Sequence, residues 1–440
     1  MLIEFKVANF RSIREQQTLS LVASNADKSL SGCVIERPLP GLAGLRFLKG
    51  AALYGANASG KSNVIQAIGF LRDFVVNSAT KLQPGDKTGA EPFKLDRESA
   101  TKPSEFEITF VADTTNVVGE AQATRFVFGL AVTPQRVIEE YLVAYPFGSP
   151  RTCYHRAYKE TENSYEWANP SIGFKRDKSL EQKTRENCLY LSVGPQFNHP
   201  QLIEVFEWLK QHLMLIRHDL QNIIQYDLTA YLFSNNFYTT EIVNFVKSAD
   251  TGIVNAIVEE VKTNLDNFKT NLSQPDYEVF KQEMLKLLPE KKYDISLIHK
   301  NESGDPVVLS FDNEESSGTR QLFALVGYWM IALRTGSTIF IDEIETSLHP
   351  LLVKELLKLL LSETHNPKGA QIIFTTHNPV LLDTALLRRD QIWFTEKSPA
   401  GATTLYPLTD YQPRKDEALA KGYLAGRYGG IPFIPEGLKL

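Results

Sequence analysis

Gly55-Ala56-Asn57-Ala58-Ser59-Gly60-Lys61-Ser62 is the stretch that decides the fold of this chain. It matches the pattern G-x-x-x-x-G-K-[ST] and lies between an apolar run at 50–54 and a helical pattern at 63–71. Strand, glycine-rich turn and helix in this order are typical of a phosphate-binding loop, because the glycines let backbone N–H groups curl around an anion. The helix N-terminus adds its partial positive charge. The sequence therefore predicts a nucleotide site on a parallel α/β core.

Two side chains of this loop carry the expected chemistry. Lys61 can reach the β- and γ-phosphates of a nucleoside triphosphate, and the Ser62 hydroxyl can bind Mg²⁺. An ordinary Gly/Ser turn with an unrelated lysine is the alternative, and the flanking strand and helix disfavour it. The residues expected to contact the nucleotide are Asn57, Ala58, Ser59, Gly60, Lys61, Ser62 and Asn63.

Length and composition bound the protein more broadly. A chain of 440 residues suffices for about two or three domains, and 43% hydrophobic residues predict a well-buried core. The net charge of −5 argues against a surface that coats nucleic acid, although a local basic patch stays possible. The widely spaced Cys33, Cys153 and Cys188 predict no disulfide framework and suit a reducing compartment. No apolar run approaches the roughly 20 residues of a membrane span, so we expect a cytoplasmic protein without membrane contact.

Hydrophobic periodicity divides the chain into three predicted parts. Residues 1–195 form an N-terminal ATPase lobe with the loop and an antiparallel β-subdomain, residues 196–292 form a helical insertion, and residues 293–440 form a C-terminal lobe. The lobe's alternating, strand-like runs are 2–8, 17–23, 105–111, 125–132 and 140–145. The insertion's expected helices are 202–210, 240–247, 252–265 and 277–288. From residue 316 onward, helices alternate with strands, which implies a parallel sheet and an α/β fold class.

Two strand ends far downstream carry polar residues. Asp342 and Glu343 end an apolar run that is typical of a buried parallel strand. Ligands bind at the carboxyl ends of such strands, so Asp342 can complete the Mg²⁺ shell and Glu343 can act as general base. His377 ends the next apolar run and can hydrogen-bond a γ-phosphate. Each feature alone would be an ordinary strand end, and the phosphate-binding loop favours catalytic roles for Lys61, Glu343 and His377.

Ser316, Ser317 and Gly318 open an apolar helix one element before the Asp342 strand. Small hydroxyl and glycine residues at a helix start expose N–H groups that can bind an anion. A plain helix N-cap is the alternative interpretation. The motif order matches that of ABC-type ATPases, whose signature is written Leu-Ser-Gly-Gly-Gln. Here Glu315, Ser317 and Thr319 replace the leucine, the first glycine and the glutamine.

Together these motifs resemble those of the ABC/SMC-like ATPases of the RecF, SMC and OLD type. The opening Asn9-Phe10-Arg11 is similar to the N-terminal turn of that family, and the resemblance implies that Arg11 lies near the nucleotide. More closely, the chain resembles single-chain AAA/ABC-like ATPases of bacterial anti-phage defence loci, of the RloA, Septu, PARIS and retron types. The segments that carry this closer resemblance are 54–63, 316–322, 342–350, 375–379 and 422–432.

The resemblance implies a mechanism. Two heads are expected to form a homodimer, or a larger homo-oligomer, around two ATP molecules with Mg²⁺, and hydrolysis through Glu343 to open it. Each ATP is expected to touch the lysine loop of one copy and Ser316 to Gly318 of the other. The stretch between the loop and Ser316 is too short for a long coiled coil, and no nuclease domain is visible after His377. The effector, a nuclease or toxin, is therefore expected on a separate chain.

Two other functions stay open. One is a RecF-like ATPase of DNA repair and recombination, which the acidic composition disfavours and which predicts salt-sensitive duplex binding. The other is an ATP-locked scaffold with little turnover. Steady-state ATPase measurements separate the scaffold from the hydrolytic switch.

Overall fold

The computed structural model describes residues 1–115, 121–171, 173–216, 226–249, 252–261, 292–414 and 417–432. The chain divides into two compact units. The first unit comprises residues 1–216, 332–345 and 353–440, and the second comprises residues 217–331 and 346–352. Within the described ranges, no helix has both the length and the apolar character that crossing a membrane requires.

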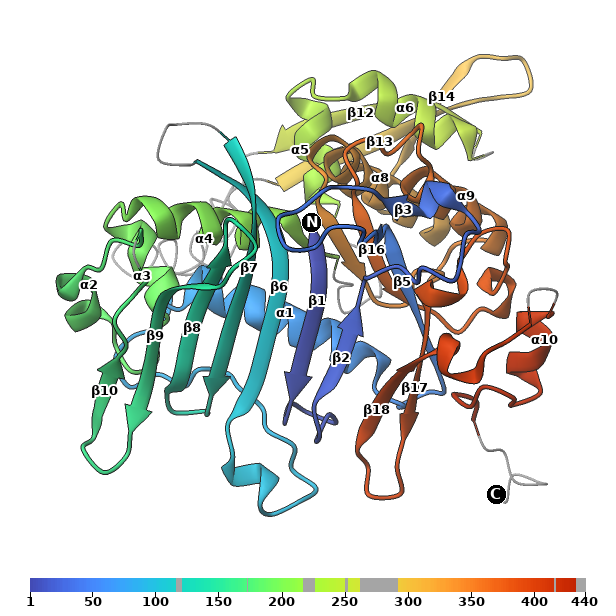
Figure 1. Ribbon diagram of the computed structural model, residues 1–440. Coiled ribbons are helices and arrows are strands. Elements are labelled where there is room, and N and C mark those ends of the chain that lie inside the picture. Colours follow the sequence, from blue (N-terminus) through green and yellow to red (C-terminus); the bar gives the residue numbers. More distant parts are fainter. Residues whose placement is uncertain are drawn as a thin grey trace. The chain divides into compact units, whose positions relative to one another are not determined.

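A seven-stranded antiparallel sheet forms much of the first unit (Figure 1). Its strand order is β10-β9-β8-β7-β6-β1-β2. Phe5 and Val7 of β1 are buried while Lys6 is partly exposed, because successive strand residues point to opposite faces. The strands are β1 (Leu2–Ala8), β2 (Gln17–Ser20), β6 (Ser104–Thr115), β7 (Ala121–Val132), β8 (Val137–Tyr145), β9 (Arg151–Lys159) and β10 (Ser164–Trp167).

A second, six-stranded sheet of the first unit has the order β11-β15-β16-β5-β17-β18. All neighbours are parallel except the antiparallel pair β17 and β18. Every residue of β5, β15 and β16 is buried, which explains their nearly unbroken apolar sequences. The strands are β5 (Gly50–Gly55), β11 (Leu213–Ile216), β15 (Thr338–Ile341), β16 (Gln371–Thr375), β17 (Ile392–Lys397) and β18 (Thr403–Pro407). A separate short pair joins β3 (Val34–Ile35) to β4 (Phe47–Leu48).

Helix α1 (Lys61–Asn77) packs against both sheets and crosses behind the antiparallel strands in Figure 1. Val64, Ile68 and Leu71 recur every three or four residues, so they lie on one helix face and enter the core that also holds Phe5 and Leu53. The other helices that lie wholly or mostly in this unit are α2 (Lys178–Lys183), α3 (Tyr190–Gln196), α4 (Pro200–His212), α9 (Pro350–Leu361) and α10 (Leu419–Leu424).

The second unit contains a three-stranded antiparallel sheet of order β12-β13-β14. Its helix α8 packs on α5 so closely that Gly327 leaves no room for a side chain, since a Cβ there would lie 2.5 Å from Thr229 Oγ1. The Thr229 hydroxyl accepts the Gly327 N–H at 3.0 Å and donates to the Ala324 carbonyl at 3.0 Å. The elements are α5 (Asp227–Ser234), α6 (Thr239–Ser248), β12 (Ile253–Val261), β13 (Lys292–Lys300), β14 (Pro306–Ser310) and α8 (Ser317–Thr335), whose last residues belong to the first unit.

The helix predicted for residues 252–265 is wrong, because Ile253–Val261 is strand β12. Ile253, Ile257 and Val261 recur every four residues, a spacing that falls on one face of a helix and equally on one face of a strand. Their β-branched side chains favour the strand, and β13 supplies the hydrogen-bonding partner. The helix predicted for residues 277–288 lies outside the described residues.

The predicted α/β class is confirmed, with a parallel sheet after the glycine-rich loop and an antiparallel N-terminal sheet. Strands β9 and β10 enlarge that antiparallel sheet, and neither is among the strands predicted from the sequence. The hairpin of β17 and β18 is also absent from the prediction.

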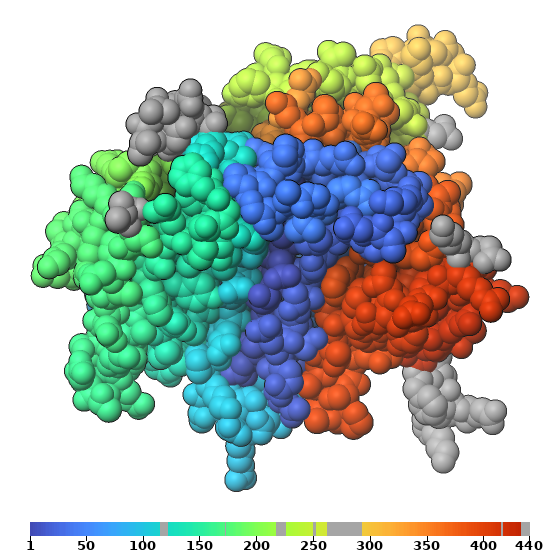
Figure 2. Space-filling model, in the orientation of Figure 1, coloured from blue at the N-terminus to red at the C-terminus, as the bar shows by residue number. Residues whose placement is uncertain are grey.

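Distant parts of the sequence form one continuous surface of the first unit (Figure 2, blue beside orange-red). The Gln17 side chain of β2 accepts the Leu405 N–H of β18 at 2.7 Å. The Gln371 side chain of β16 accepts the Leu2 N–H at 2.7 Å and donates to the Leu2 carbonyl at 3.0 Å. The first two strands of the chain are thus hydrogen-bonded to β16 and β18.

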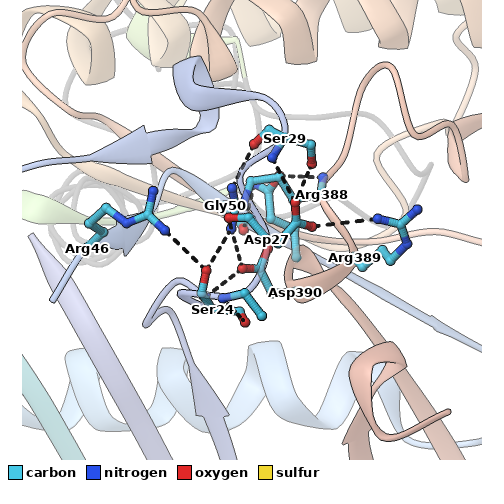
Figure 3. A network of polar contacts seen from close by, with 10 residues as sticks. Ser24, Asp27, Ser29, Arg46, Gly50, Arg388, Arg389 and Asp390 are labelled. Atoms are coloured by element: carbon cyan, nitrogen blue, oxygen red, sulfur yellow. Dashed lines mark hydrogen bonds and ion pairs between the residues drawn. The ribbon is translucent and has the colours of Figure 1, made fainter. Parts of the chain in front are cut away.

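A buried ion pair fixes the start of β17 (Figure 3). Arg388 Nε and Nη2 donate to the Asp390 carboxylate at 2.9 and 2.7 Å, and the Arg388 side chain is fully buried. Arg388 also donates to the carbonyls of Ser29 at 2.7 Å and Asp27 at 3.1 Å. The Ser24 N–H donates to Asp390 at 2.7 Å. This network joins the N-terminal loop to the strand that borders β5.

Candidate nucleotide-binding site

The loop of residues 55–62 connects the end of β5 to the start of α1, as its pattern predicts. Gly60 has φ of 109°, and a Cβ there would lie 2.1 Å from Thr403 Oγ1, so the position requires glycine. Among the described residues, no side chain caps the first turn of α1, and that turn contains no acidic residue. The positive end of the helix dipole therefore has no carboxylate of its own to compete with a phosphate.

Lys61 lies beneath the loop and is 5% exposed. Its Nζ donates to the carbonyls of Gly55 at 2.9 Å and Ala56 at 3.1 Å. Burial lowers the pKa of Lys61, and nearby carboxylates oppose this shift. Charge-assisted hydrogen bonds to phosphate oxygens are stronger than bonds to neutral carbonyls, so a phosphate can draw the ammonium away from the loop.

Hydroxyl groups from distant parts of the chain support this loop. Thr403 of β18 donates to the Ser59 carbonyl at 2.9 Å, and its Oγ1 lies 2.7 Å from Ser12 Oγ. Ser59 Oγ lies 2.5 Å from Thr395 Oγ1 of β17. Asn63, predicted to contact the nucleotide, donates its side-chain N–H to Ser12 Oγ at 2.5 Å. The loop sequence alone contains no signal for Ser12, Thr395 or Thr403, because they meet it only in the folded chain.

Asn57 and Ala58 form the exposed tip of the loop, where Ala58 has φ of 62°. Ser62 is partly exposed in the first turn of α1. Arg11 lies beside the same helix: its guanidinium donates to Glu91 at 2.8 Å and to Gln66 of α1. The contact of Arg11 with a nucleotide stays a prediction.

Three neighbouring strand ends converge on this loop. Strand β16 lies between β5 and β15, so the residues that follow these parallel strands share one edge of the sheet. Thr375, the last residue of β16, donates its hydroxyl to Asp342 Oδ1 at 2.5 Å and accepts the Glu343 N–H at 2.7 Å. Glu343 has φ of 49°, a costly conformation for a residue with a side chain, and that side chain is 52% exposed.

His377 lies at the same edge. Its Nε2 is 3.9 Å from Glu343 Oε1, and its backbone N–H donates to Glu345 Oε1 at 2.6 Å. Burial lowers the pKa of His377, with a further contribution from the Lys61 charge, whereas the carboxylates of Glu345, Glu343 and Asp342 oppose the shift. A neutral imidazole retains one N–H that can donate to a phosphate oxygen.

The residues predicted to bind Mg²⁺ are a hydroxyl and a carboxylate, Ser62 and Asp342. Mg²⁺ is usually bound through one or two such protein oxygens, while substrate phosphates and water complete its octahedron. Asp342 is held by Thr375 on one oxygen, which leaves the other oxygen of the carboxylate for a metal ion. The donor set therefore fits Mg²⁺ that is shared with a nucleotide.

Ser316, Ser317 and Gly318 belong to the second unit, where they begin α8. Ser316 Oγ accepts the Thr319 N–H at 3.1 Å, so Ser316 serves as the N-cap of the helix. Ser316 and Ser317 are exposed. A Cβ on Gly318 would lie 2.8 Å from the Ser347 carbonyl, which explains the glycine. Contact of these residues with ATP stays a prediction.

Similar folds occur among solved structures. The SMC head bound to the C-winged helix domain of ScpA aligns at 15% identity over 92% of this chain and 96% of that chain, with a TM-score of 0.40. An SMC head domain from Thermotoga maritima aligns at 14% identity over 92% and 98%, with a TM-score of 0.36. An Smc head domain with a coiled coil and joint derived from Pyrococcus yayanosii aligns at 13% identity over 97% and 99%, with a TM-score of 0.37.

No curated protein matches the sequence. The family model described as "AAA domain, putative AbiEii toxin, Type IV TA system" matches residues 51–383. This range contains the loop after β5, the carboxylates after β15 and the histidine after β16, and it spans more than half of the chain. The chain therefore belongs to this AAA-domain family.

Proposed function

We propose that this chain binds ATP with Mg²⁺ and hydrolyses it. The convergence of three adjacent strand ends, which brings Lys61, Asp342, Glu343 and His377 to one sheet edge, is the observation that carries the proposal. Lys61 and the N-terminus of α1 bind the phosphates, and Ser62 and Asp342 hold the metal ion. Mg²⁺, when bound, neutralises charge on the β- and γ-phosphates. The exposed Glu343 carboxylate accepts a proton from water, and His377 donates to the γ-phosphate.

Two copies close around two ATP molecules in this proposal. The exposed hydroxyl groups and helix start at Ser316, Ser317 and Gly318 contact the γ-phosphate held by the other copy. Donors from both sides stabilise that charge better than donors from one side. ATP therefore favours the closed dimer by its differential affinity for that state, and hydrolysis reopens it.

The dimer controls a separately encoded effector, a nuclease or toxin, in anti-phage defence. The family description, which names a putative toxin of a type IV toxin–antitoxin system, supports this context. The same words favour a second candidate, in which this chain is itself the toxic component. Expression of the chain alone arrests growth under the second candidate and is tolerated under the first.

The variant Glu343→Gln tests the proposed hydrolysis. The amide keeps the shape of the side chain and removes the base, so kcat should fall about 10²- to 10⁴-fold while ATP affinity changes little. Phosphate release measures kcat, calorimetry measures affinity, and size-exclusion chromatography with light scattering should show ATP-dependent dimers accumulating. Glu355→Gln is the matched control, because Glu355 is an exposed residue of α9 that pairs with Lys358.

Each contrary result removes a defined part of the proposal. Wild-type turnover in Glu343→Gln excludes Glu343 as the base, and absence of ATP binding by the unaltered chain excludes the nucleotide site. Release of the effector at an unchanged rate in Glu343→Gln favours the ATP-locked scaffold. Salt-sensitive binding of duplex DNA that requires ATP favours the RecF-like alternative.

A further inference from the structure

Glu345 belongs to none of the roles assigned above, yet it connects two of the strand ends. It follows the Asp342-Glu343 pair by two residues, after the left-handed turn at Glu343. Its Oε1 accepts the His377 N–H at 2.6 Å. Its Oε2 is buried and has no hydrogen-bond partner among the described residues. The carboxylate therefore spans from the loop after β15 to the loop after β16.

The backbone around His377 is held at each residue. The Thr376 N–H donates to the Leu53 carbonyl of β5 at 3.1 Å, and the Asn378 N–H donates to the Thr376 hydroxyl at 3.0 Å. Tyr54 of β5 donates its hydroxyl to the Asn378 carbonyl at 3.3 Å. Among these three N–H groups, only that of His377 is bound to a charged acceptor, and that bond is the shortest.

A neutral acceptor would satisfy the His377 N–H at lower cost. Burying a carboxylate oxygen without a donor is unfavourable, and a glutamine side chain would accept the same bond without a buried charge. The negative charge of Glu345 therefore does more than a neutral side chain of the same size would do. It shortens and strengthens the bond that sets where the His377 ring stands, 3.9 Å from the Glu343 carboxylate.

We propose that Glu345 is a positioning residue of the nucleotide site, which fixes the His377 backbone and thereby the separation of the His377 ring from Glu343. The expected effect on turnover rests on the proposed function, whereas the fixing of the His377 backbone by Glu345 does not. Because displacement of a reacting group by about 1 Å can cost about 100-fold in rate, a weakened bond should act on kcat. ATP affinity, which rests on the loop and α1, should stay nearly unchanged.

The structural part is tested without nucleotide. Protein labelled with ¹⁵N-histidine gives one backbone amide signal for each of its eight histidines, and His377→Gln identifies the His377 signal by its loss. A strong bond to a carboxylate places that proton downfield. We expect Glu345→Ala to move the signal upfield, Glu345→Gln to move it partway, and the control Glu355→Ala to leave it unchanged. An unmoved signal in Glu345→Ala overturns the proposal.

The functional part is tested with ATP and Mg²⁺. Glu345→Gln should lower kcat about 10- to 100-fold with little change in the dissociation constant for ATP, and Glu355→Gln should change neither. If Glu345→Ala does not fold, the His377 amide shift and the kcat of Glu345→Gln test the proposal by themselves. A variant that loses thermal stability but keeps the amide shift and kcat overturns the positioning role. If the amide signal moves in Glu345→Ala but the unaltered protein hydrolyses no ATP, the positioning role of Glu345 is retained and only the proposed function is rejected.

Discussion

A single hydroxyl organises the acidic part of the candidate site. Thr375 uses its one proton for Asp342 and accepts the Glu343 N–H, so both residues of the acidic pair are fixed by the neighbouring strand. The bond to the Glu343 N–H also helps to hold Glu343 in its left-handed conformation. The positions of Asp342 and Glu343 therefore depend on β16 as much as on β15, the strand that they follow.

Thr375→Val should damage turnover more than folding. Valine keeps the shape of threonine but leaves the Glu343 N–H and the Asp342 oxygen without partners, which costs roughly 1–3 kcal/mol. We expect kcat/KM for ATP to fall about 10- to 100-fold, because Asp342 and Glu343 lose their fixed positions. Steady-state phosphate release checks this, with exposed Thr384→Val as the control. Equal rates for the two variants would contradict the role given to the hydroxyl.

The sequence predicts the candidate catalytic side chains better than the residues that hold them in place. Lys61, the Asp342-Glu343 pair and His377 follow from local patterns, because each starts a helix or lies just after the end of a strand. Thr375 lies in segment 375–379, which carries part of the family resemblance, but its bridging role depends on which strand lies beside β15. Strand order is a property of the folded sheet, and no residue spacing predicts which strand will lie beside β15.

At the scale of elements, the hairpin of β17 and β18 supports the loop of residues 55–62. It contributes Thr395 to the Ser59 side chain and Thr403 to the Ser59 carbonyl. Gly60 lies against Thr403 so closely that no Cβ fits between them. The shape of the loop is therefore determined by packing against this hairpin as well as by its own glycines.

Thr403→Val should weaken nucleotide binding without abolishing it. The substitution removes one hydrogen bond to the Ser59 carbonyl and one to Ser12, each worth about 1 kcal/mol. We expect the ATP dissociation constant to rise about 5- to 30-fold. Calorimetry with a non-hydrolysable analogue measures it, and Thr404→Val, at the exposed neighbouring position, is the control. Unchanged affinity in Thr403→Val would show that the loop keeps its shape unaided.

Whether a segment forms a helix or a strand is predictable where its hydrophobic period and its length indicate the same element. The buried run before Asp342 and the long pattern after Lys61 give the correct strand and helix. Residues 252–265 give the wrong element, because a repeat of four fits both periods and only the partner strand β13 decides between them. Pairing across such sequence distances is invisible to a local pattern.

For the molecule as a whole, the Arg388–Asp390 pair is a demanding interaction, because the Arg388 side chain is fully buried. Arg388→Met should lower the free energy of unfolding of the first unit by about 3–5 kcal/mol, because the Asp390 charge stays buried without its partner. Urea unfolding followed by tryptophan fluorescence measures the loss. Arg14→Met, which removes an exposed pair with Glu15, should change stability by less than about 1 kcal/mol. Similar losses in both variants would mean that water reaches the Arg388 site.

The position of β5 between β16 and β17 also determines when the site can appear during biosynthesis. At roughly 5–20 residues per second, a ribosome needs about 17–68 seconds to progress from residue 55 to the end of β17. Until β16 has been synthesised the apolar β5 has neither of its hydrogen-bonding neighbours, and until β17 is complete one edge of β5 stays unpaired and open to aggregation. The candidate site is thus complete only in a polypeptide whose translation has passed Lys397, the last residue of the strand that pairs with β5.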